Sequence, residues 1–283
     1  MPIVAKKGRN MCTGNPHHKH ALISEIHAVR DQEILFDKPF LKSVEDDENV
    51  TLARKNHKEN PTFQTLMELG NALAFQMRYN EAISCFEDSI KINPDDYQAR
   101  RKCAGRYLST LRLDNAEEGF LWCDARAEDK LDTKYMLGCC AYYKYEYEKA
   151  MGYFDECFAL SEDDDDMYVA VLFWAIACAV QLGLDVTDVL QKYKDLHIGH
   201  HTGYMQSVCL FMGDDIETCD NIPYDDELQR CIFSYGVHLY YLYNADEMRA
   251  DVALQSTLSR DTYFSAFAYL GAYTEYLKLN PNS

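Results

Sequence analysis

The middle of this 283-residue chain repeats itself every 34 residues. Three alanines keep this spacing, and three phenylalanines keep it four residues further on: Ala82, Ala116, Ala150, Phe86, Phe120 and Phe154. The register holds without a gap and defines three units, residues 63–96, 97–130 and 131–164. A period of this length is typical of stacked repeats, in which each unit buries its apolar face against its neighbours. The spacing therefore restricts the centre of the chain to a repeat architecture.

Each unit is predicted to form two helices joined by a turn. In the first unit, apolar and small residues recur at helical spacing in two stretches: Leu66, Leu69, Gly70 and Leu73, then Ala82, Ile83, Phe86, Ser89 and Ile90. Gly70 and Ala82 are small enough to let two helix backbones approach, and Phe86 is expected to fill the volume beneath them. Asn93-Pro94 then ends the second helix, because proline cannot continue it.

This pattern resembles the tetratricopeptide repeat family. The family pattern is an aromatic residue, two residues, Leu-Gly, two residues and Tyr, followed by Ala, three residues, Phe and then Pro. The first unit matches it in order with Leu66, Leu69, Gly70, Leu73, Ala82, Phe86 and Pro94, with Leu at both aromatic positions. The second unit carries Cys103, Ala104, Tyr107, Ala116 and Phe120, and the third carries Leu137, Gly138, Ala150 and Phe154. The resemblance implies an all-α, right-handed solenoid of helix-turn-helix repeats.

The chain is expected to have four parts. These are a flexible N-terminal tail (1–19), a helical segment with a linker (20–62), the three regular units (63–164), and divergent helical repeats with capping helices (165–283). Outside the units, amphipathic or apolar stretches predict helices at 21–31, 49–59, 167–182, 186–196, 202–212, 225–243, 246–258 and 262–277. Atypical units are expected at the ends of a repeat stack, because one of their faces meets solvent.

The charge balance excludes two kinds of partner. Lys and Arg number 28 and Asp and Glu number 46, so the net charge is −18. A chain this acidic lacks the cations that neutralise nucleic-acid phosphates, and anionic membrane surfaces repel it. We therefore expect neither a nucleic acid nor a membrane as the partner.

The cysteines and the apolar segments indicate a cytoplasmic protein. Eleven cysteines are present without any C-x-x-C pair, which favours free thiols in a reducing compartment. The N-terminus lacks the apolar core of a signal peptide. The most apolar run, residues 169–180, is shorter than the roughly 20 residues that a membrane span requires.

Few residues suggest catalysis or a cofactor. His197, His200 and His201 lie close together in sequence and suggest a metal site, the basis of a metal-dependent enzyme as an alternative. A loop between helices, turned by Gly199, is the favoured interpretation. The chain contains no glycine-rich phosphate loop and no G-x-S-x-G elbow. We therefore expect no enzyme, no cofactor and no bound metal.

The resemblance implies a groove lined by the first helix of each unit. The residues on that face, expected to bind a peptide, are Met67, Asn71, Ala74 and Phe75, then Arg101, Gly105, Leu108 and Ser109, then Tyr135, Cys139, Tyr142 and Tyr143. Exposed aromatic residues of this kind are typical of binding surfaces. The alternative is that the C-terminal helices fold back and cover this strip. Some relatives hold a terminal carboxylate with a Lys/Asn/Asn/Lys/Arg set, of which only Asn71 is present here.

The sequence thus predicts a non-enzymatic interaction module of the adaptor, scaffold or co-chaperone type, which binds a peptide or helix of another protein. A ligand that is apolar or mildly basic in its middle suits the aromatic strip, with Arg101 available to bind one carboxylate. A regulatory protein that senses a peptide or small molecule in the groove is the other candidate. Self-association of the chain is left open.

Overall fold

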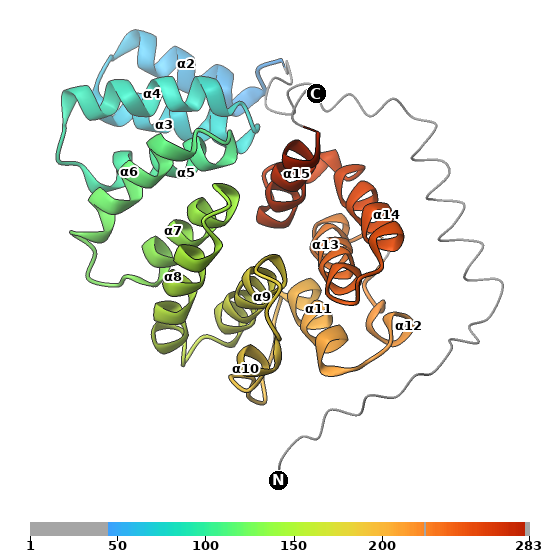
Figure 1. Ribbon diagram of the computed structural model, residues 1–283. Helices are drawn as coiled ribbons and strands as arrows, with labels where there is room; N and C mark the ends of the chain where they lie inside the picture. Colours follow the sequence, from blue (N-terminus) through green and yellow to red (C-terminus); the bar gives the residue numbers. More distant parts are fainter. Residues whose placement is uncertain (1–44, 224, 281–283) are drawn as a thin grey trace. The chain divides into compact units, whose positions relative to one another are not determined.

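Helices follow one another in hairpin pairs along the chain (Figure 1). The computed structural model describes residues 45–223 and 225–280, so the expectations for the tail 1–19 and for a helix at 21–31 lie outside the described residues. No strand occurs in these two ranges. The helices are α2 (Glu48–Glu59), α3 (Phe63–Phe75), α4 (Tyr79–Ile92), α5 (Tyr97–Ser109), α6 (Leu113–Asp124), α7 (Leu131–Tyr143), α8 (Tyr147–Leu160), α9 (Asp165–Gln181), α10 (Thr187–Leu190), α11 (Thr202–Met212), α12 (Ile216–Cys219), α13 (Glu227–Tyr243), α14 (Glu247–Leu258) and α15 (Phe267–Leu279), with a 3₁₀ turn at Asp261–Tyr263 before α15.

The 34-residue period is visible in the backbone. Helices α3, α5 and α7 begin at residues 63, 97 and 131, the first residues of the three units, and α9 begins at 165, where a fourth unit would start. The turn inside each unit places one residue in the left-handed region: Met77, Leu111 and Tyr145, with φ of 58°, 54° and 63°. A left-handed residue suits the end of a helix, where it redirects the chain and lets a following N–H bond a free carbonyl.

The helix crossings depend on small residues. A Cβ atom at Gly70 would lie 2.6 Å from the Phe86 ring, and one at Gly138 would lie 2.6 Å from the Phe154 ring. Because both distances are below van der Waals contact, only glycine allows the two helices of these units to approach as closely as they do. The prediction that Phe86 fills the volume beneath Gly70 is confirmed by this geometry, and Phe154 has the same place beneath Gly138.

The predicted helix at 186–196 is mostly absent. Helix α10 covers only Thr187–Leu190, and the chain then runs without regular structure to α11. Local backbone bonds extend only to Lys192 and Tyr193, and α9 holds the rest of the segment. Tyr168 Oη donates to the Lys192 carbonyl at 2.6 Å, and Asp166 accepts the N–H groups of His200 and His201 just before α11. Tertiary partners of this kind replace the hydrogen bonds that a helix would have supplied.

The C-terminal helices return to the third unit. Helix α15 packs against α7, α13 and α14. Tyr143 donates a hydrogen bond to the Phe267 carbonyl at 2.9 Å, and Tyr145 donates one to the Thr274 carbonyl at 2.7 Å. The largest buried cluster therefore combines residues from units two and three with residues more than a hundred positions further along the chain. No described helix is both long enough and apolar enough to cross a membrane.

Candidate peptide-binding face

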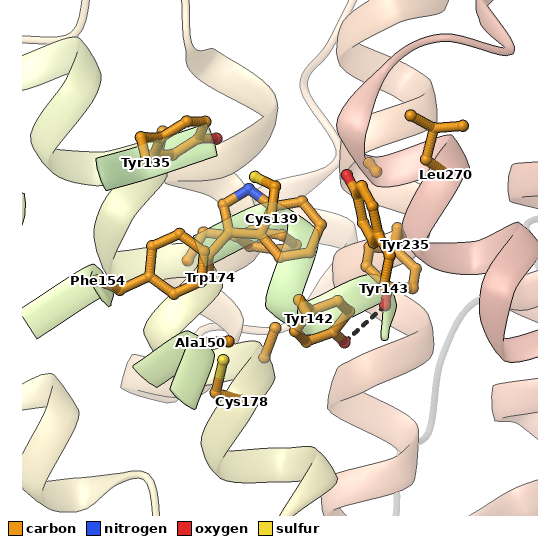
Figure 2. Close-up of a cluster of buried hydrophobic side chains, with 14 of the residues drawn as sticks. Tyr135, Cys139, Tyr142, Tyr143, Ala150, Phe154, Trp174, Cys178, Tyr235 and Leu270 are labelled. Carbon is orange, nitrogen blue, oxygen red and sulfur yellow. Dashed lines mark hydrogen bonds between the residues drawn. The ribbon is translucent and has the colours of Figure 1, made fainter. Parts of the chain in front are cut away.

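The aromatic residues expected to line the groove in unit three lie in the core (Figure 2). Tyr135, Cys139, Tyr142 and Tyr143 are at most 4% exposed. Trp174 of α9 stands with its ring centroid 4.9 Å from that of Tyr142. The expectation of an open strip at unit three is therefore not met in this structure, because the C-terminal helices cover the face that the first helices of a repeat stack leave free.

A buried hydrogen-bond network fastens this cover. The Tyr142 and Tyr235 hydroxyl oxygens lie 2.7 Å apart (Figure 2), and Tyr235 also donates to Glu275 of α15. The other carboxylate oxygen of Glu275 lies 2.9 Å from Nε2 of His238, whose Nδ1 lies 2.7 Å from the Ala250 carbonyl oxygen. Since both ring nitrogens face oxygen acceptors, the geometry fits a protonated imidazole paired with a carboxylate.

Burial and pairing oppose each other in the titration of this pair. Burial by itself would lower the pKa of His238, but the charge and hydrogen bond of Glu275 and the hydrogen bond to the Ala250 carbonyl together raise it above 6.5. Burial would likewise raise the pKa of Glu275, and the charge and hydrogen bond of His238 lower it below 4.5 instead. Each partner therefore favours the charged form of the other in the folded protein.

Part of the predicted face in units one and two is also closed. Met67 is 7% exposed and Leu108 is 1% exposed, and both belong to buried apolar clusters. Gly105 and Ser109 are buried as well. The open residues of the predicted face are Asn71 and Phe75 on α3, with Ala74 and Arg101 partly exposed beside them.

These open residues border a cavity of about 440 Å³ between α3 and α5. We call it the α3–α5 groove, and its lining residues are Asn71, Ala74, Phe75, Phe86, Arg101, Lys102 and Arg106. Phe75 is 82% exposed, although its ring is among the most apolar groups in the chain. An exposed aromatic ring beside a concave surface is a typical anchor point for a ligand.

The groove is more basic than the sequence analysis expected. Lys102 and Arg106 were not among the predicted site residues, and the signal that could have identified them is their spacing of one helical turn on α5. Burial lowers the pKa of Arg106, and the positive charge of Arg101 lowers it further. The Arg106 guanidinium lies over the Tyr79 ring, 4.6 Å from its centroid.

An ion pair forms the far wall of the groove. Arg101 donates to Asp132 through Nε at 2.5 Å and through Nη2 at 2.6 Å. Gly105 makes room for this arrangement, since a Cβ there would lie 3.0 Å from an Arg101 nitrogen. Burial would lower the pKa of Arg101, but the hydrogen bond and charge of Asp132 raise it. Arg101 is thus neutralised from within the chain.

A second cavity lies beyond this ion pair. It has a volume of about 300 Å³ and is lined by Asp129, Leu131, Asp132, Tyr135, Met136, Met167, His201, Tyr204 and Phe267. Asp132 lines this cavity and Arg101 lines the α3–α5 groove, so their ion pair separates the two. The second cavity is apolar with an acidic rim, in contrast to the basic groove.

The histidines at 197–201 form a loop and do not converge. The side chains of His197 and His200 are 90% and 80% exposed. Asp166 accepts the backbone N–H groups of Gly199, His200 and His201 at 2.8–3.1 Å, which fixes the loop through its backbone. Within residues 45–223 and 225–280 no group of three or more His, Cys, Asp or Glu side chains is arranged to hold a metal ion.

The stacked hairpins define the class of protein: an all-α solenoid built from helix-turn-helix repeats. Within that class, residues 63–96 match the family model of the tetratricopeptide repeat. The matched residues are those of the first unit, so the chain contains a tetratricopeptide repeat formed by α3 and α4.

Several solved structures of MamA are similar to this chain at low sequence identity. One MamA crystal structure has 16% identity and a TM-score of 0.46, and the match covers 50% of this chain and 83% of that one. MamA AMB-1 has 13% identity and a TM-score of 0.46, with coverage of 74% and 97%. Residues 41 to the end of MamA from Desulfovibrio magneticus RS-1 have 17% identity and a TM-score of 0.43, with coverage of 64% and 97%. The search of curated proteins finds no match.

Proposed function

We propose that this chain is a non-enzymatic interaction module of the cytoplasm that binds a peptide or helix of another protein in the α3–α5 groove. The observation that carries the proposal is Phe75, which is 82% exposed at the edge of a cavity of about 440 Å³. The tetratricopeptide repeat at residues 63–96 supports it, because the groove lies on the first helix of that repeat.

The side chains around Phe75 suit a polypeptide ligand. Asn71 lies one turn before Phe75 on α3, and its exposed amide can both donate and accept hydrogen bonds, as a peptide backbone requires. Phe75 offers the apolar contact that a side chain of the ligand would cover. The cytoplasmic part of the proposal is supported by ten described cysteines that are all unpaired, as in a reducing compartment.

A site-specific cross-link tests the proposal. A photoreactive phenylalanine analogue at position 75 should cross-link a partner in the native cell. The same analogue at position 248, where Met248 of α14 is 78% exposed, should not. Phe75→Ala should weaken capture of that partner by about tenfold or more, equivalent to about 1.4 kcal/mol or more.

Stability measurements separate loss of binding from loss of folding. Because Phe75 is largely exposed, Phe75→Ala should melt within a degree or two of the parent, and Met248→Ala should leave both capture and melting unchanged. Equal capture by the parent and by Phe75→Ala would contradict the proposal.

A further inference from the structure

We infer that the polypeptide segment bound in the α3–α5 groove is acidic: its carboxylates pair with Lys102 and Arg106, and an apolar side chain beside them covers Phe75. This inference rests on the proposed function and specifies the chemistry of its ligand. The sequence-based expectation of an apolar or mildly basic ligand depended on the aromatic strip of unit three, which is buried.

The first argument is the local excess of positive charge. The chain carries 46 acidic and 28 basic residues, yet the groove is lined by three cations and by no carboxylate. Asp132 on the far side of Arg101 neutralises one of the three. The groove is thus cationic in a strongly anionic protein, and its charge is complementary to an acidic segment.

The second argument is that two of the cations have no carboxylate partner. In the part of the chain that the structure describes, no Asp or Glu oxygen lies within 4.0 Å of the charged nitrogens of Lys102 or Arg106, and Arg101 is the groove cation that has one. Lys102 and Arg106 are also like charges four residues apart on one helix, an arrangement that destabilises the helix. Carboxylates from a ligand would relieve this repulsion.

The third argument is that Arg106 is held in place before any ligand arrives. Its guanidinium is stacked on the Tyr79 ring, and the Tyr79 hydroxyl donates to Ser265 at 2.8 Å. Ring contact with Phe264, at a centroid distance of 5.6 Å, fixes Tyr79 further. A guanidinium fixed in this way can bind a carboxylate with little loss of side-chain entropy.

Phe75 specifies the second feature of the ligand. It lines the same cavity as Lys102 and Arg106, so a short segment can reach all three side chains. Burying an aromatic ring that is 82% exposed would contribute apolar contact area, to which the charged contacts add orientation. An acidic segment with one large apolar residue therefore matches the groove.

Two synthetic peptides test the inference. One carries glutamates on both sides of a leucine, and the other has glutamine at each of those positions. Both are acetylated and amidated, so neither has a charged terminus. Fluorescence anisotropy with the full chain should give the glutamate peptide at least about tenfold tighter binding at low salt. The preference should shrink as salt is raised, because exposed ion pairs are screened.

Matched variants locate the effect in the groove. Arg106→Gln and Lys102→Gln should each remove most of the preference for the glutamate peptide. Circular dichroism should show unchanged folding for at least the Lys102 variant, since Arg106 also packs on the Tyr79 ring. Lys91→Gln is the control, because Lys91 is 73% exposed on α4 and already paired with Asp88. The Lys91→Gln variant should prefer the glutamate peptide over the glutamine peptide as strongly as the parent does.

The outcomes separate this inference from the proposed function. Equal binding of the two peptides, binding of neither, or an effect of Lys91→Gln as large as that of Arg106→Gln overturns the acidic assignment. If the cross-link at position 75 still captures a partner, the proposed function survives that result. Tight binding of inorganic phosphate without a preference between the peptides would assign the groove to a phosphate-bearing ligand and would also overturn the inference.

Discussion

At the residue scale, close helix approach is preserved even where the repeat pattern is broken. Unit two has Ala104 at the position of Gly70 and Gly138, yet its helices α5 and α6 also pack against each other. The additional methyl group is accommodated by Gly119, where a Cβ would lie 2.7 Å from the Ala104 Cβ. Gly119 stands where unit one has Cys85. The missing glycine of one helix is thus compensated on the facing helix.

The glycine positions can be tested by adding a single methyl group. Gly138→Ala places a Cβ 2.6 Å from the Phe154 ring, so we expect it to lower the free energy of unfolding by about 1–3 kcal/mol through overpacking. Gly152→Ala is the control, since a Cβ there meets nothing within 4 Å. Because alanine favours a helix over glycine, Gly152→Ala should raise the free energy of unfolding by up to about 1 kcal/mol. Urea titration measures both, and equal values for the two variants would contradict the crossing geometry.

At the element scale, the turns of the repeats and the loop before α11 obey different rules. The turns at Met77, Leu111 and Tyr145 recur because the same backbone conformation closes each hairpin. The helix predicted at 186–196 ends at Leu190, and hydrogen bonds to Tyr168 and Asp166 of α9 hold the chain between there and α11. A short stretch of sequence is enough to predict the repeated turns. It does not show that α9 supplies the hydrogen bonds of the loop before α11.

Asp166 can be tested as the residue that orders this loop. Although burial would raise the pKa of Asp166, the backbone N–H donors of His201, His200 and Gly199 lower it. Asp166→Ala leaves these N–H groups without their acceptor, which costs about 1–3 kcal/mol for the loop. Hydrogen exchange at those amides should therefore become faster by about tenfold or more. Asp163→Ala, in the same acidic run but exposed, should leave exchange unchanged.

At the scale of the whole described region, α15 decides which part of the repeat face is accessible. It covers unit three through Tyr143, Tyr235 and Glu275, and it leaves Phe75 and the α3–α5 groove open. The buried pair of His238 and Glu275 couples α13 to α15, so the cover depends on protonation as well as on packing.

The pH dependence of stability tests this coupling. The pKa of His238 is raised in the folded state, so its stabilisation is complete below pH 6.5 and is lost as the pH rises through the folded pKa. The pKa of Glu275 is lowered, so its stabilisation is present above pH 4.5 and is lost as the pH falls through the folded pKa. The pair should therefore contribute most between pH 4.5 and 6.5.

His238→Gln should reveal that contribution. Removing one partner of a buried ion pair costs about 3–5 kcal/mol, and we expect this loss in urea unfolding near pH 5.5. The loss should be smaller at alkaline pH, where the parent has already lost the imidazolium. His200→Gln, with a side chain that is 80% exposed, should follow the parent at every pH. A His238→Gln deficit that does not change with pH would show that packing and not charge fastens α15.

The sequence by itself determined the repeat units, their paired helices and the glycines at the crossings. All of these depend on contacts between residues fewer than 34 positions apart, and such contacts leave a period that can be read along the chain. Only the tertiary structure decided which side of the repeats is open. From sequence alone, Tyr142 fits an exposed groove as well as a core. In the structure its hydroxyl is buried beside Glu275, a residue more than a hundred positions further along the chain. Burial of that kind depends on contacts with helices that lie far along the chain and follow no period. Because α15 covers the aromatic face of unit three, the α3–α5 groove is the part of the predicted face that stays open.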